Sequence, residues 1–286
     1  MSTGNHHSLN STPVLNTVQP LIHAEGLGKQ YFRRQSFSGR RLLVQAFENV
    51  NLRIFPAKTL ALIGESGAGK SALGRCLAFL ERPTRGNIWF EGRNVTELKK
   101  NDLFPLRRRV QLVFQDPTSA LNPQMTAEEI IAEPLTIQRE GTRSEWREQA
   151  VQLLEQVGLP GSWLRKRPLE FSGGQRQRLA IARALALEPM LLIADEAWSG
   201  LDLLNQELIL KLFARLQAAR ALTYLYISHD LQLLSRYSDQ VAVMYHGQIV
   251  EQKETADLFA HPEHPYTRDL LAAMPPIESI YRERFG

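Results

Sequence analysis

The sequence contains the octapeptide Gly64-Glu65-Ser66-Gly67-Ala68-Gly69-Lys70-Ser71, which matches the phosphate-binding pattern G-x-x-x-x-G-K-[ST] at every fixed position. The apolar run before it, residues 59–63, predicts a buried strand, and residues 71–80 after it predict a helix. The glycines allow the backbone to curl so that successive N–H groups point at phosphate oxygens. Lys70 would reach the β- and γ-phosphates, and the Ser71 hydroxyl would bind Mg²⁺. The octapeptide therefore predicts a binding site for a nucleoside triphosphate.

Length and composition are those of an ordinary globular chain of 286 residues, of which 43% are hydrophobic and 22% are charged. No apolar stretch approaches the roughly 20 residues that cross a bilayer, and residues 1–20 lack the apolar core of a signal peptide. We expect residues 1–20 to be a disordered tail and the protein to stay in the compartment where it is made. Cys76 is the single cysteine, so the sequence excludes a disulfide within one chain.

The formal net charge is +4, and basic residues form four short clusters: Arg33-Arg34, Arg40-Arg41, Lys99-Lys100 and Arg107-Arg108-Arg109. Nucleic acid or an anionic membrane face would explain such clusters. They are scattered along the chain, however, and no aromatic RNA-binding pattern lies beside them. We therefore favour a solvated basic surface and expect no nucleic-acid partner.

The order of the predicted elements indicates an α/β fold with a mainly parallel sheet, because strands alternate with helices. The octapeptide resembles the loop of P-loop NTPases, which implies a RecA-like core. Predicted strands at 21–27 and 44–55 precede the octapeptide and indicate an antiparallel β subdomain. Residues 118–167 have helical character, with a capping box at Thr126 and Glu129 and a second cap at Ser144. A long amphipathic helix is predicted at 203–220.

The domain organisation follows from these elements. We expect a disordered N-terminal tail (1–20), one nucleotide-binding domain (21–260) with an inserted α-helical subdomain (about 117–188), and a C-terminal tail (261–286).

Polar side chains follow three of the predicted strands. Asp195 and Glu196 come after the apolar run 190–194, His229 follows a strand, and so does Gln115. Parallel sheets bind ligands at the carboxyl ends of their strands. Asp195 would bind Mg²⁺, and Glu196 would orient or deprotonate a water. His229 would either bond a γ-phosphate or be structural, and Gln115 would either reach Mg²⁺ or a water or be an ordinary loop residue.

A second phosphate-binding geometry is predicted at Ser172, Gly173, Gly174 and Gln175, where a helix begins with free N–H groups and a hydroxyl. A simple explanation for two such sites in one chain is that the second serves the nucleotide of another copy. The aromatic ring of Tyr31 would either stack on an adenine base or pack within a hairpin.

Residues 171–175 resemble the LSGGQ signature motif of ABC-type ATPases, with Phe171 in place of Leu. The resemblance covers roughly residues 21–266, and it implies a role for each candidate residue. Residues 64–71 would be Walker A, 191–195 Walker B, Glu196 the catalytic glutamate, Gln115 the Q-loop glutamine, 199–202 the D-loop, His229 the switch histidine and Tyr31 the aromatic A-loop residue.

Residues 113–123 (VFQDPTSALNP) and 261–267 (HPEHPYT) are similar to the ATPase subunits of bacterial oligopeptide, dipeptide and nickel importers. Many such subunits carry a cysteine cluster further on. This sequence has none, so it resembles the partner subunit that lacks a cluster. It departs from the family pattern at Ala197-Trp198, usually Pro-Thr, and at Gly200, usually Ala. Neither change removes a catalytic group, but the bulky Trp198 could alter a dimer interface.

The resemblance implies an ATP-hydrolysing importer subunit at the cytoplasmic face of the bacterial inner membrane, with ATP and Mg²⁺ as cofactors. Lys70, Gln115, Glu196 and His229 would serve hydrolysis. Two permease subunits and a second ABC ATPase, a copy or a sister chain, would be its partners. A solute-binding protein would act indirectly, by delivering a short peptide, nickel or another small solute.

Two alternatives remain open on the sequence. One is a soluble ABC ATPase that acts on nucleic acid or ribosomes, although such proteins usually carry two nucleotide domains in one chain or a long coiled-coil insertion. The other is an ATP-binding regulatory module with poor hydrolysis, which the unusual Trp198 would explain.

Overall fold

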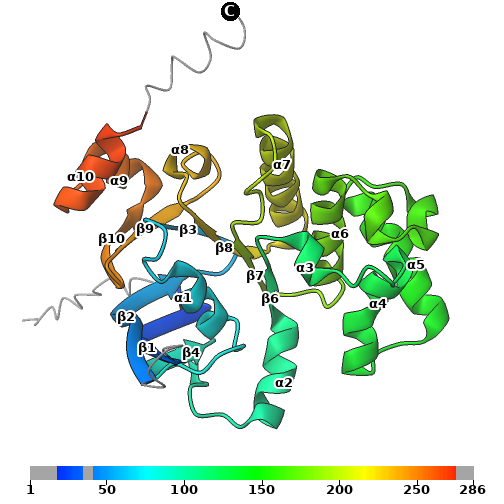
Figure 1. Ribbon diagram of the computed structural model, residues 1–286, viewed down its shortest axis with the longest axis horizontal. Coiled ribbons are helices and arrows are strands. Elements are labelled where there is room, and N and C mark those ends of the chain that lie inside the picture. The colour runs from blue at the N-terminus through cyan, green and yellow to red at the C-terminus, as the bar shows by residue number, and fades with distance from the viewer. Residues whose placement is uncertain (1–17, 35–40, 275–286) are drawn as a thin grey trace, which may run out of the picture.

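The computed structural model describes residues 18–34 and 41–274 (Figure 1). The predicted N-terminal tail therefore lies almost wholly outside the described residues, and so does the last part of the predicted C-terminal tail.

The larger sheet has six strands in the order β10-β9-β3-β8-β7-β6. The strands β6 to β9 and β3 run parallel to their neighbours, and only β10 at one edge is antiparallel. The prediction of a mainly parallel sheet is therefore confirmed. The bounds are β3 (Thr59–Ile63), β6 (Val110–Val113), β7 (Leu191–Asp195), β8 (Thr223–Ser228), β9 (Gln240–Tyr245) and β10 (Gln248–Glu254).

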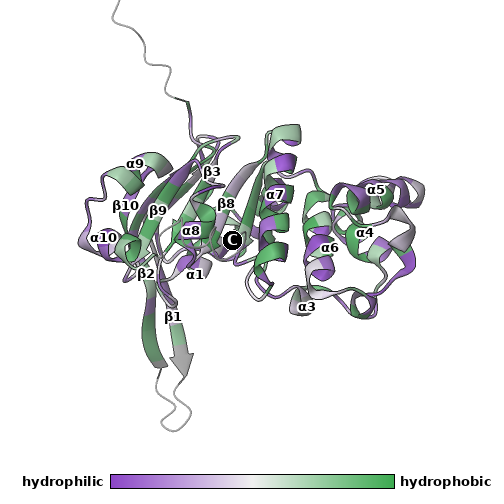
Figure 2. Cartoon of the chain, turned by 90° about the horizontal axis from the view of Figure 1, so that it is seen from above, coloured by the Kyte–Doolittle hydropathy of each residue, from purple (hydrophilic) through white to green (hydrophobic). Residues whose placement is uncertain are grey.

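The smaller sheet is antiparallel, in the order β2-β1-β4-β5, and it confirms the predicted antiparallel subdomain. Its strands are β1 (Ile22–Arg34), β2 (Arg41–Ile54), β4 (Arg85–Phe90) and β5 (Arg93–Asn94). The strand β1 is longer than the prediction that ended at Leu27, because the pairing with β2 continues across register shifts. Figure 2 shows β1 and β2 extending away from the body of the molecule.

Helix α1 (Lys70–Leu77) packs between the two sheets, and its buried side chains share one hydrophobic cluster with β1, β2 and β3. Helix α7 (Leu203–Arg220) agrees with the predicted helix, and Asp202 caps it by accepting a hydrogen bond from the Asn205 amide. The remaining helices of the core are α2 (Lys100–Arg109), α8 (Leu231–Leu234), α9 (Thr255–Ala260) and α10 (Pro265–Ala272).

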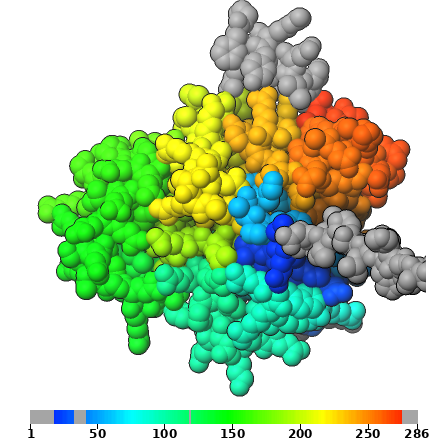
Figure 3. Space-filling view, turned by 180° about the vertical axis from the view of Figure 1, so that it is seen from behind, coloured from blue at the N-terminus to red at the C-terminus, as the bar shows by residue number. Residues whose placement is uncertain are grey.

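The predicted helical insertion is present and forms one end of the molecule, opposite the C-terminal elements (Figures 1 and 3). It contains α3 (Pro117–Ala120), α4 (Ala127–Gln138), α5 (Arg143–Gln156), α6 (Gly173–Leu185) and two 3₁₀ helices, η1 (Gly161–Arg165) and η2 (Pro168–Glu170).

The capping box at Thr126 and Glu129 is confirmed. The cap predicted at Ser144 is wrong, because Thr142 caps α5 through a capping box with Glu145.

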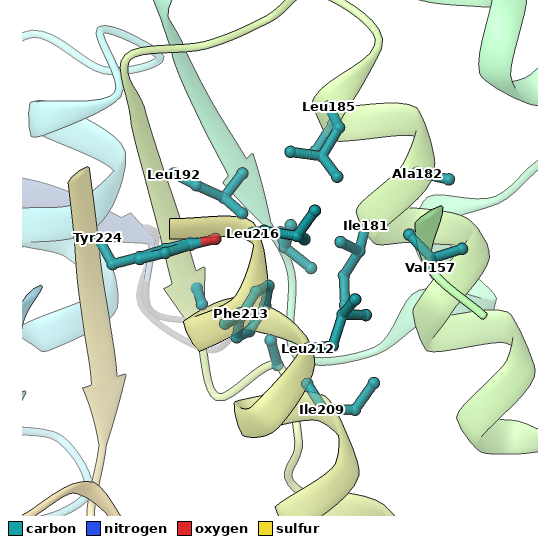
Figure 4. Close-up of a cluster of buried hydrophobic side chains, with 14 of the residues drawn as sticks. Val157, Ile181, Ala182, Leu185, Leu192, Ile209, Leu212, Phe213, Leu216 and Tyr224 are labelled. Carbon is teal, nitrogen blue, oxygen red and sulfur yellow. The ribbon is translucent and has the colours of Figure 1, made fainter. Parts of the chain in front are cut away.

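Apolar side chains join the insertion to the larger sheet. Ile181 and Leu185 of α6 are fully buried in one cluster with side chains of α7, β7 and β8. Figure 4 shows this cluster between α6 and α7, with Leu192 and Tyr224 on the side of the sheet. The aromatic ring of Phe213 lies 5.2 Å from that of Tyr224, between ring centroids. The insertion therefore shares a continuous hydrophobic core with the sheet.

Among the described residues, no helix combines the length and the apolar character that crossing a membrane requires.

Phe213→Ala should lower the free energy of unfolding by about 3–5 kcal/mol, because it removes a large aromatic side chain from a fully buried position and leaves a cavity. Urea denaturation followed by circular dichroism measures this loss. Leu208→Ala on the same helix is the matched control, since Leu208 is 40% exposed and its truncation should cost far less. Equal losses in the two variants would contradict the packing described for α7.

Candidate nucleotide site

The octapeptide forms the turn between β3 and α1 that the sequence predicts. Gly69 lies at the N-terminus of α1 with a φ of 100°, in the left-handed region that favours glycine. A Cβ at Gly69 would collide with the carbonyl oxygen of Ala46, and one at Gly64 with that of Met244. The close approach of these backbones explains why glycine is required at both ends of the loop.

The side chain of Lys70 turns back into this loop. Its ammonium donates hydrogen bonds of 2.6 Å to the carbonyl of Gly64 and 2.8 Å to that of Glu65. The residue is buried, and burial lowers the pKa of Lys70, while the nearby charges of Glu196 and Asp195 oppose this shift. A positive charge is therefore held inside the loop, where a phosphate would need it.

The hydroxyl of Ser71 donates a hydrogen bond of 3.0 Å to Oδ1 of Asp195. Asp195 ends β7, and Ser71 lies on α1 directly after the loop, so the contact joins elements 124 residues apart. Burial raises the pKa of Asp195, and the hydrogen bond from Ser71 partly offsets that effect. The structure therefore brings together two of the three oxygen ligands predicted for Mg²⁺.

Glu196 follows Asp195 with a φ of 48°, which directs its side chain differently from that of Asp195. Its amide donates to the carbonyl of Ile227 (2.9 Å), which fixes this unusual backbone. One carboxylate oxygen lies 3.3 Å from Nδ1 of His229, and the other accepts a hydrogen bond of 3.1 Å from the Ser199 hydroxyl. The contact with Ser199 was not predicted; the Glu-x-x-Ser spacing across a turn was the only signal for it.

Gln115 lies beyond the end of β6, next to β7 in the sheet, and its side chain is exposed. It therefore lies at the same edge of the sheet as Asp195, but no hydrogen bond ties it to Asp195 or Ser71 among the described residues. Its role as a ligand of Mg²⁺ or of water stays a prediction.

The segment from Ser172 to Gln175 begins α6 through a capping box. The amide of Gln175 donates to the Ser172 hydroxyl, and the amide of Ser172 donates to the Gln175 side chain (2.9 Å). In Figures 1 and 2, α6 lies apart from α1, with strands of the larger sheet between them. The segment is thus separated from the phosphate loop of its own chain.

Tyr31 lies on β1, and its hydroxyl donates a hydrogen bond of 2.5 Å to Glu81 and accepts one of 3.3 Å from Arg75. The ammonium of Lys29 lies 5.0 Å from the ring centroid. These contacts hold the ring beside the C-terminal end of α1, and stacking on adenine stays a prediction.

Trp198 is 2% exposed and packs edge-on against Tyr226 of β8, with 5.4 Å between ring centroids. The large side chain of Trp198 therefore lies within the hydrophobic core, close to Glu196 in the chain. Gly200 has a φ of 79° and no neighbour close to where a Cβ would stand.

Two protein-family models match the sequence. The model described as ABC transporter matches residues 47–199, and the oligopeptide/dipeptide transporter C-terminal region matches residues 250–284. A dipeptide transport ATP-binding protein of Haemophilus influenzae is 40% identical over 93% of this chain and 81% of its own length. A putative peptide import ATP-binding protein of Brucella ovis is 44% identical over 91% and 80%. A glutathione import ATP-binding protein of Pectobacterium atrosepticum is 43% identical, but this chain spans only 43% of it.

Solved structures show the same fold. A dimeric, post-hydrolysis ATP-binding cassette bound to ADP and phosphate has a TM-score of 0.72 and 27% identity, covering 82% of this chain and 98% of the other. A subunit of an ABC transporter complex of Clostridium perfringens has a TM-score of 0.73 and 26% identity, covering 92% and 99%.

Lys70→Ala should weaken the binding of a fluorescent ADP analogue about 10- to 100-fold, because charge-assisted hydrogen bonds contribute about 1.5–3 kcal/mol each. A fluorescence titration of the purified chain measures the dissociation constant. Lys100→Ala, at the exposed start of α2, is the matched control for the loss of one positive charge. Unchanged binding by Lys70→Ala would remove this residue from the site.

Proposed function

Because the chain belongs to the family of ABC transporter ATP-binding proteins, we propose that it drives a bacterial importer of short peptides, nickel or another small solute. The chain is an ABC-type ATPase with the fold of nucleotide-bound cassettes. The observation that carries the proposal is that one chain matches both the ABC transporter model and the oligopeptide/dipeptide C-terminal region. Relatives named for dipeptide and peptide import support the same cargo class. The alternative role on nucleic acid or ribosomes has no comparable support.

ATP would bind with its phosphates in the loop formed by residues 64–71. The phosphates would bring negative charge beside the carboxylates of Asp195 and Glu196, which lie near the positive charge of Lys70. A divalent cation would offset this charge, and the adjacent oxygens of Ser71 and Asp195 suit Mg²⁺. When bound, Mg²⁺ neutralises charge on the phosphate oxygens. Gln115 would complete the site from β6, and Tyr31 would lie under the adenine.

Glu196 would act on the attacking water. Its carboxylate is 17% exposed and is already held by His229 on one side and Ser199 on the other. A carboxylate fixed by two partners can orient a water and accept its proton without first losing side-chain freedom. His229, whose side chain is 59% exposed, would reach the γ-phosphate from the neighbouring strand end.

The nucleotide would be shared between two ATPase subunits. The N–H groups of Gly173 and Gly174 at the start of α6 lie away from the loop of their own chain, as a site for the nucleotide of a partner would require. The solved cassette that resembles this chain is dimeric, which supports a pair of ATPase subunits. The partner would be a second copy or a sister chain.

Each of the two permease subunits would dock on one ATPase subunit, in the groove between the sheet and the helical insertion. A cavity of about 220 Å³ lies there, lined by residues that include Val113, Phe114, Ala120, Pro134 and Ala180. By resemblance to the family, this groove receives a helix of the permease. The chain would then be peripheral, at the cytoplasmic face of the inner membrane, and a solute-binding protein would supply the cargo from outside.

Glu196→Gln should bind ATP as the unchanged protein does but hydrolyse it at least about 100-fold more slowly, because the amide cannot accept a proton. Phosphate release and equilibrium titration measure the two properties separately. Glu148→Gln, an exposed carboxylate on α5, controls for the loss of charge. Near-normal hydrolysis in Glu196→Gln would exclude the assigned role.

A tagged chain isolated from its native cells in mild detergent should bring down two proteins with several membrane spans, identified by mass spectrometry. A second ATPase in the same sample would show a sister chain, and its absence would indicate two copies of this chain. Recovery of ribosomal proteins or nucleic acid alone, without a membrane partner, would overturn the importer.

A further inference from the structure

The C-terminal segment returns to the phosphate loop. The backbone amide of Glu65 donates a hydrogen bond of 3.2 Å to the hydroxyl of Tyr266, which lies 201 residues later on α10. Tyr266 belongs to the region that matches the oligopeptide/dipeptide C-terminal model. This contact therefore ties the part of the chain typical of peptide importers to the loop common to all ABC ATPases.

The ring of Tyr266 is held by a second aromatic ring. It stacks on Tyr245 with 4.1 Å between centroids and 21° between ring planes. Tyr245 ends β9, and β9 pairs with β3, the strand that leads into the loop. The hydroxyl is consequently aimed at Glu65 from a support on the same sheet as the loop.

A buried carboxylate anchors the turn that leads into α10. Glu251 of β10 accepts hydrogen bonds from the amides of Glu263 (2.9 Å) and His264 (3.1 Å). The ring of His264 then accepts a hydrogen bond from the amide of Tyr266 (3.2 Å). The side chain of Glu251 is only 4% exposed, so this anchor is shielded from water. The position of Tyr266 is thus determined from both its ring and its backbone.

The space around the contact is otherwise open. A cavity of about 670 Å³ lies between the loop and α10, lined by residues that include Gly64, His229, Tyr245 and Leu270. On the other side of the same turn, the Lys70 ammonium holds the carbonyls of Gly64 and Glu65. The peptide unit between Gly64 and Glu65 is therefore bonded at both of its polar groups: its carbonyl accepts from Lys70, and its amide donates to Tyr266.

We propose that Tyr266 is a positioning residue for the phosphate loop, through which the C-terminal segment holds the loop ready for nucleotide. Without its hydroxyl, the Glu65 amide borders the open cavity and the loop samples other conformations. The apparent affinity for nucleotide then falls in proportion to the fraction of molecules whose loop remains in the nucleotide-binding conformation. At saturating ATP the bound phosphates themselves order the loop, so the loss of the Tyr266 hydroxyl changes kcat little.

The test is Tyr266→Phe in the full chain, with Tyr245→Phe as the matched control. Each variant removes one phenolic oxygen and keeps the stacked rings, but the Tyr245 hydroxyl makes no hydrogen bond among the described residues. For Tyr266→Phe we expect the KM for ATP and the Kd of a fluorescent ADP analogue to rise about 3- to 10-fold, with kcat within about twofold, since one hydrogen bond is lost. Tyr245→Phe should leave both constants unchanged.

Hydrogen exchange measures the protection of the Glu65 amide itself, which a change in packing alone would not alter. Peptides spanning residues 60–66 should exchange faster in Tyr266→Phe than in the unchanged protein or in Tyr245→Phe, because the Glu65 amide has lost its acceptor. The proposal is overturned if the two variants behave alike, or if Tyr266→Phe lowers thermal stability without changing Kd or exchange. Nucleotide binding by the unchanged protein, measured in the same titration, tests the proposed function separately.

Discussion

The hydrogen bond from the Ser71 hydroxyl to the Asp195 carboxylate joins the phosphate loop to the far side of β8. It exists because β3, β8 and β7 run parallel as neighbours, which places the carboxyl ends of all three at one edge. The same order brings His229, directly after β8, within 3.3 Å of the Glu196 carboxylate. The phosphate loop, the proposed metal ligands Ser71 and Asp195, and Glu196 thus depend on one set of strand pairings.

The hydrophobic core behind this edge makes the arrangement rigid. Trp198 and Tyr226 pack on one another directly behind Glu196, and Phe213 of α7 contacts Tyr226. The same cluster continues through α7 to the helical insertion. A movement of the insertion therefore acts on the backbone that carries Glu196, because close-packed interiors transmit displacement. If a permease docks on the insertion, as proposed, its displacement would reach Glu196 through this core.

The C-terminal elements give the loop a second support. The anchor at Glu251 and the stacked rings of Tyr245 and Tyr266 bring α10 against the amide of Glu65. Lys70 donates a hydrogen bond to the Gly64 carbonyl of the same peptide unit. Lys70, the proposed phosphate ligand, and the C-terminal segment thus contact the same peptide unit, between Gly64 and Glu65.

Local patterns in the sequence determined the loop, the capping box at Thr126 and the helix capped by Asp202, because each is encoded within a short continuous stretch of residues. Helix α2 was not predicted, because Leu103 is its only buried residue and it contains Pro105, a residue that disfavours helix. Only the tertiary structure decided that Trp198 is buried, that Ser71 meets Asp195 and that Tyr266 meets Glu65. Such contacts depend on which strands pair, and β3 lies more than a hundred residues from its partners β8 and β9 in the sequence. Strands pair through backbone hydrogen bonds, which produce no periodic pattern of residue types.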